Sequence, residues 1–81
     1  MHTLKLERDG GRIREIFSSV INLKVEYLAD NIADVEYTQV TDGDEIASGV
    51  TLKEGSRMFV INEAGETIDA IYSTQRKPSS D

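Results

Sequence analysis

The chain has 81 residues, one histidine, no cysteine and a formal net charge of −6. This length suits one small domain with a core of marginal size, and the lack of cysteine excludes disulfides and cysteine-based zinc sites. No stretch reaches the roughly 18 apolar residues of a membrane span, and the N-terminus lacks the apolar segment of a signal peptide. We therefore expect a soluble, cytoplasmic protein without membrane contact.

Residues 1–8 have the pattern of a short strand. Leu4 and Leu6 alternate with Lys5 and Glu7. Because side chains alternate between the two faces of a strand, the leucines share one face and the charged residues share the other.

Asp9-Gly10-Gly11 interrupts this pattern, and the chain beyond it allows two continuations. In the first, residues 12–21 form a helix with an apolar stripe at helical spacing, made of Ile13, Ile16, Phe17 and Val20. In the second, Asp9-Gly10 is a hairpin turn and residues 12–17 return as a strand. That strand would set Lys5 opposite Arg14 and Leu4 opposite Glu15, both unfavourable pairs, so we favour the helix.

Residues 23–73 are expected to be mostly strand. Residues 23–27 alternate apolar and charged side chains, and residues 29–34 form a connection. Four runs rich in β-branched and aromatic residues come next, at 35–41, 46–52, 57–61 and 67–73. The turns between them contain Gly43, Gly55 and Gly65, and this spacing is typical of a hairpin meander.

Consecutive pairing of these four runs gives one consistent register. It sets Val35 opposite Leu52, Val50 opposite Phe59, and Phe59 opposite Ala70. The face that these residues share is the predicted core, made of Val35, Tyr37, Ile46, Val50, Leu52, Phe59, Ile61, Ile68, Ala70 and Tyr72.

The opposite face of this ribbon is mixed in polarity. Its apolar residues are Val40, Met58, Val60 and Ile71. A patch of this size must be covered by another segment, by closure of the sheet or by a partner. The predicted helix is our first candidate to cover it.

Charge is distributed unevenly along the chain. Residues 1–24 are slightly basic, whereas residues 25–52 contain no Lys or Arg and have seven acidic residues: Glu26, Asp30, Asp34, Glu36, Asp42, Asp44 and Glu45. Direct binding to nucleic acid needs a clustered basic surface and is therefore disfavoured. A basic protein partner would be attracted.

No residue pattern indicates catalysis or a cofactor. The carboxylates of Asp42-Gly43-Asp44-Glu45 lack the ligand alternation and the distal glutamate of a calcium loop. Ser48 and Ser56 lack the flanking residues of a nucleophile elbow, and the single histidine, His2, is not placed to act as a base. We predict no catalytic, cofactor-binding or metal-binding residue and no enzyme activity.

Taken together, these patterns predict an α+β domain over residues 1–74 and a disordered tail over residues 75–81. The expected architecture is a small antiparallel β-meander or half-open barrel of five to six strands with one N-terminal helix. An all-β fold is the alternative.

The predicted function is non-catalytic protein binding or assembly. The contact residues would lie on an acidic surface, made of Asp30, Asp34, Glu36, Asp42, Asp44 and Glu45, or on the second sheet face, made of Met58, Val60 and Ile71. The partner would be a basic protein, and a homodimer is also compatible with the second face. Two alternatives are an acidic inhibitor that mimics nucleic acid to block a DNA- or RNA-handling enzyme, and a small enzyme subunit completed across a dimer.

Overall fold

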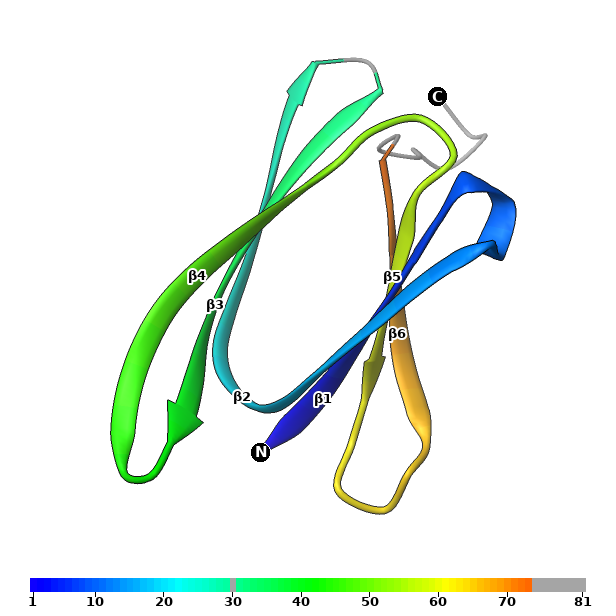
Figure 1. Ribbon diagram of the computed structural model, residues 1–81. Coiled ribbons are helices and arrows are strands. Elements are labelled where there is room, and N and C mark those ends of the chain that lie inside the picture. The colour runs from blue at the N-terminus through cyan, green and yellow to red at the C-terminus, as the bar shows by residue number, and fades with distance from the viewer. Residues whose placement is uncertain (30, 74–81) are drawn as a thin grey trace, which may run out of the picture.

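Six strands form one open antiparallel sheet in the computed structural model, which describes residues 1–29 and 31–73 (Figure 1). The strands are β1 (His2–Arg8), β2 (Ile13–Ala29), β3 (Ile32–Thr41), β4 (Asp44–Leu52), β5 (Arg57–Ile61) and β6 (Thr67–Tyr72). Their order across the sheet is β4-β3-β2-β1-β5-β6, so β4 and β6 are its edges. The described residues therefore have the all-β fold, and the predicted tail lies outside them.

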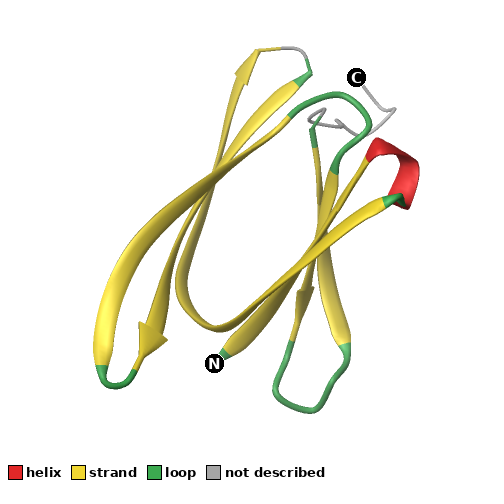
Figure 2. Ribbon diagram, in the orientation of Figure 1, coloured by secondary structure: helices red, strands yellow, loops and turns green. Residues whose placement is uncertain are grey.

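The predicted helix over residues 12–21 is wrong. The helical segment of the described residues is the single 3-10 turn η1 (Asp9–Gly11), red in Figure 2 between β1 and β2. β2 comes next, and Ile13 and Ile16 of the supposed apolar stripe are 51% and 68% exposed. Isoleucine and valine recur along β2, and these β-branched residues suit a pleated strand better than a helix. Within residues 1–29 and 31–73, no helix has the length and apolar character that crossing a membrane requires.

A longer turn than expected removes the like-charged pair of the strand alternative, although a leucine, now Leu6, still lies opposite Glu15. The turn runs from Asp9 to Arg12, whose backbone N–H donates to the Asp9 carbonyl at 3.3 Å. It shifts the register by two residues, so that Glu7 faces Arg14 and Lys5 faces Ile16. Opposite charges therefore lie across this hairpin in place of like charges.

β2 bends and divides the sheet into two halves. It pairs with β1 up to Val20 and with β3 from Val20 onward. Around this change of partner the register shifts twice, and Ser19 and Asn22 have left-handed backbone angles, with φ of 57° and 56°. Bulges of this kind bend a strand and increase its twist. In Figure 1, β2 descends from η1, turns in the lower half of the picture and rises beside β3.

The core lies between the two halves. It takes side chains from β1, β5 and β6 on one side, from β3 and β4 on the other, and from β2 at the bend. The buried residues are Leu4, Leu6, Val20, Ala33, Val35, Tyr37, Leu52, Met58, Val60 and Ile71. The rings of Phe17 and Tyr37 have centroids 5.4 Å apart, so the strand before the bend contacts a strand beyond it.

The predicted core side of β3 and β4 is confirmed, although the pairing is two residues out. A two-residue turn at 42–43 sets Val35 opposite Val50 and not opposite Leu52. Because side chains alternate with period two, a slip of two residues leaves each of them on its original face. Val35 and Leu52 are accordingly fully buried.

The predicted faces of β5 and β6 are inverted. The predicted pair of Val50 with Phe59 is wrong because β5 lies beside β1, with Leu6 opposite Met58. Directly opposite residues share a face of the sheet. Because Leu6 is buried, Met58 opposite it is buried too. The pairing of Phe59 with Ala70 is confirmed.

The apolar patch predicted on the second sheet face is therefore largely interior. Met58, Val60 and Ile71 are 0%, 4% and 5% exposed. Bending of the sheet covers them, and no helix among the described residues takes part. Three residues predicted as core are instead about half exposed: Ile46, Ile68 and Tyr72.

The inverted face can be tested with a pair of alanine substitutions. Met58→Ala should lower the free energy of unfolding by about 2–5 kcal/mol because it leaves a cavity in a closed core. Ile68→Ala should change it by less than about 0.5 kcal/mol because the side chain is exposed. Urea unfolding followed by circular dichroism measures both, and a larger loss for Ile68→Ala than for Met58→Ala would contradict the assigned faces.

The bend can be tested at Ser19. Ser19→Val should cost about 1–2 kcal/mol because a left-handed backbone is unfavourable for a side chain with a branched Cβ. Ser19→Gly should retain or raise the stability because glycine adopts this conformation readily. Ser18→Val is the matched control, since Ser18 does not have a positive φ. Equal stability of the two valine variants would exclude strain at Ser19.

Candidate functional site

Carboxylates gather on the outer face of the half formed by β2, β3 and β4. Glu26 lies opposite Asp34 and Lys24 lies opposite Glu36, on the face away from the buried Val35. We name this surface the acidic face; its carboxylates are those of Glu26, Asp34, Glu36 and Glu45. Lys24 is the one cation that the described residues place on it.

The acidic face is hollow towards β4. Gly49 lies opposite Glu36, so no β4 side chain separates this carboxylate from the sheet edge. Residues of β2, β3 and β4 line a hollow of about 710 Å³ at this point. Next along the face, Thr51 Oγ1 donates to Asp34 Oδ1 at 3.1 Å. Asp34 is thus engaged by a neighbouring strand, whereas Glu36 can be reached from the edge.

The remaining predicted acidic residues lie at the end of this face or outside the described chain. Asp42 and Gly43 both have positive φ, 51° and 83°, as in a type I′ hairpin turn, which favours Asp-Gly. Asp42 and Asp44 are exposed at this hairpin tip. The structure therefore brings Asp34, Glu36 and Glu45 together on one face and adds Asp42 and Asp44 at its end, while Asp30 lies outside the described residues.

The second predicted contact surface is not on the outside of the molecule. Met58, Val60 and Ile71 belong to the core cluster. A partner that contacts the folded chain would meet the acidic face before it meets these side chains.

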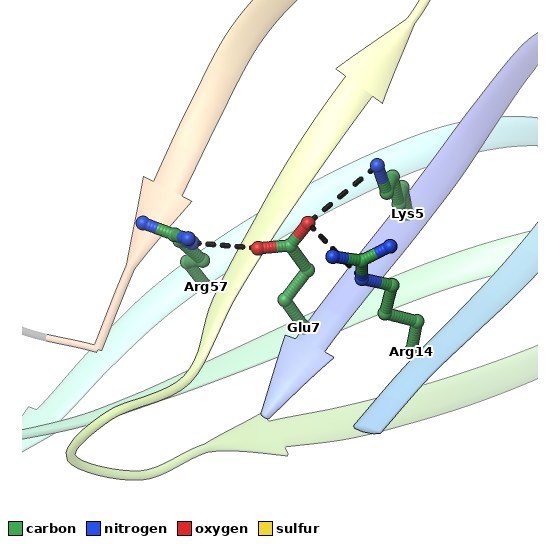
Figure 3. A network of polar contacts seen from close by, with 4 residues as sticks. All are labelled: Lys5, Glu7, Arg14 and Arg57. Carbon is green, nitrogen blue, oxygen red and sulfur yellow. Dashed lines mark hydrogen bonds and ion pairs between the residues drawn. The ribbon is translucent and has the colours of Figure 1, made fainter. Parts of the chain in front are cut away.

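A second charged cluster, which we did not predict, lies on the outer face of β1, β2 and β5 (Figure 3). Glu7 is only 7% exposed. Arg57 Nε donates to Glu7 Oε1 at 2.8 Å, and Lys5 Nζ and Arg14 Nε lie 3.5 Å and 4.0 Å from Oε2. The Arg57 guanidinium also lies over the Phe59 ring, 5.6 Å from its centroid. One carboxylate therefore links three strands, and its three cations leave this face with an excess of positive charge.

Pairing between distant strands explains why this cluster was missed. Alternation along β1 already places Lys5 and Glu7 on one face. Arg14 joins them through the β1–β2 register, and Arg57 joins through the pairing of β1 with β5, 50 residues away along the chain. Neither pairing can be deduced from local periodicity.

The cations of this cluster lower the pKa of the Glu7 carboxyl group. The hydrogen bond from Arg57 lowers the pKa of Glu7 below its ordinary value of 4.5, and the positive charges of Arg57 and Lys5 act in the same direction against desolvation. In residues 1–29 and 31–73, no three His, Asp or Glu side chains form a group that could hold a metal ion.

Comparisons with known proteins found no match, either among family models or among curated proteins and solved structures.

The Glu7 cluster makes stability depend on acid pH. Because the folded-state pKa lies below the unfolded one, the contribution of Glu7 is present above about pH 4.5 and is lost as the pH falls through the folded pKa. Glu7→Gln should therefore be less stable than the wild type at pH 7, and the difference should shrink towards pH 3. Urea unfolding at both pH values measures this difference, with Glu54→Gln in the exposed β4–β5 loop as the control. A difference that does not change with pH would contradict the assigned ion pairs.

Proposed function

We propose that this protein is a non-catalytic binding module whose acidic face holds a basic protein partner. The observation that carries the proposal is the sharing of one sheet face by the carboxylates of Glu26, Asp34, Glu36 and Glu45. Strand pairing fixes the backbone positions of these residues, so the backbone needs little ordering when a partner binds.

Segregation of charge supports this proposal. Lys5 and Arg14 of the β1–β2 hairpin and Arg57 of β5 lie in the other half of the sheet, around Glu7. The potential over the acidic face is therefore not cancelled locally, and it attracts a basic surface and orients its approach. Lys24 lies on the acidic face directly opposite Glu36, and its positive charge weakens the negative potential there.

Three charge substitutions test the proposal with a lysine-rich peptide as the probe. Glu36→Gln combined with Glu45→Gln should weaken peptide binding roughly fivefold, because each exposed charge pair contributes about 0.2–1 kcal/mol. Lys24→Gln should strengthen binding because it removes the opposing charge. Neutralisation is preferred to reversal because a lysine at position 36 would face Lys24.

The control carries the same change in net charge elsewhere. Glu54→Gln combined with Glu66→Gln alters exposed residues of the β4–β5 and β5–β6 loops and should leave the affinity within about twofold. Isothermal titration at low and at physiological salt measures all variants. Equal losses for the face pair and the loop pair would show that only net charge matters and would refute the acidic face as the site.

A further inference from the structure

The two edges of the sheet differ in how open they are. An edge strand presents unpaired backbone N–H and C=O groups, and proteins usually protect such edges. β6 is protected in two ways: its pairing with β5 shifts register between Val60 and Ile61, and Asp69 lies opposite the buried Val60. Asp69 Oδ1 also accepts the Ala70 backbone N–H at 2.8 Å.

The β4 edge lacks these protections. β4 pairs with β3 through nine consecutive residue pairs without a register shift, and residues 46–52 contain no charged residue and no proline. Figure 1 shows β4 in green on the outer side of its half of the sheet. It is thus a long, regular edge along which another strand can pair.

The turn at the hairpin tip indicates which backbone groups face outward. In a hairpin closed by a two-residue turn, the flanking residues form a hydrogen-bonded pair, and such pairs then alternate along the strands. Thr41 and Asp44 flank this turn. Alternation from that pair directs the backbone N–H and C=O groups of Ala47 and Gly49 towards the free edge, and the side-chain positions of these residues lie on the acidic face.

Gly49 opens a path from this edge to a carboxylate. It lies opposite Glu36 and has no side chain, and a Cβ built on it would be 3.6 Å from the Val35 carbonyl oxygen, an ordinary contact. Glycine is therefore not required there for lack of space. A strand paired with β4 would lie roughly 10 Å from β3, two strand spacings away, and a long cationic side chain can cross Gly49 to reach Glu36.

We propose that an extended basic segment of the partner protein pairs with β4 as a seventh strand. Backbone hydrogen bonds to Ala47 and Gly49 provide the affinity, and a lysine or arginine of the segment pairs with Glu36 across Gly49, as in other cases of strand addition. This inference rests on the proposed function and specifies how the basic partner is held. Charge disfavours a second copy of the chain as the occupant, because edge-to-edge pairing would set two acidic faces side by side.

The test uses a peptide of about eight residues that alternates lysine and valine, and the same peptide N-methylated at alternate residues so that it cannot pair as a strand. The wild type should bind the N-methylated peptide roughly five- to tenfold more weakly, the effect of one or two lost backbone hydrogen bonds. Ala47→Pro, which removes an outward N–H, should produce a similar loss for the unmodified peptide.

Gly49→Thr should fold at least as stably as the wild type but bind the peptide more weakly, because its side chain blocks the path to Glu36.

The outcomes separate this inference from the function on which it rests. If Glu36→Gln weakens binding while N-methylation, Ala47→Pro and Gly49→Thr do not, strand addition is refuted and the acidic face stands. If none of these changes has an effect, both are refuted. A dimer in sedimentation that is lost in Ala47→Pro, together with no peptide binding, would assign β4 to a second copy and overturn the inference. The N-methylated peptide keeps the test valid even if Ala47→Pro fails to fold.

Discussion

The fold depends on the bend in β2. An open sheet with one apolar face must bury that face against something, and this chain buries it against the other half of the same sheet. The bend requires left-handed backbone at Ser19 and Asn22, neither of which is glycine. Burial of the core between the two halves offsets the local strain. The single core of this small domain therefore exists only because one strand belongs to both halves.

The same bend separates charge in space. The slightly basic N-terminal residues pair with β5 around Glu7, and the acidic stretch forms the far half of the sheet. Glu7 has two consequences here. It joins three strands through ion pairs, and it neutralises part of the positive charge in its own half. The molecule therefore has one outer face of each sign, and the acidic one lies beside the open β4 edge.

The open β4 edge and the acidic face form one continuous surface. Gly49 contributes to both, because its backbone belongs to the edge and its missing side chain exposes Glu36. The opposite edge carries a bulge and Asp69. An unprotected edge strand favours aggregation unless a partner or nearby charge limits what pairs with it. In our proposal, the carboxylates beside β4 favour basic strands.

Local sequence determined a good deal of this structure. Four features are consequences of short-range pattern: the alternation of Leu4 and Leu6 with charged residues, the presence of a turn at Gly43, the core side of β3 and β4, and the clustering of carboxylates between residues 25 and 52. Tertiary structure decided whether β2 was helix or strand. Its apolar residues between 13 and 20 have helical spacing, and pairing with β1 along the first half and with β3 along the second makes the segment a strand. Tertiary structure also decided which face of β5 is buried. Side-chain alternation defines the two faces of a strand but not which of them is buried. The pairing of Met58 with Leu6 places Met58 in the core. Arg57 then lies on the outer face, where it binds Glu7.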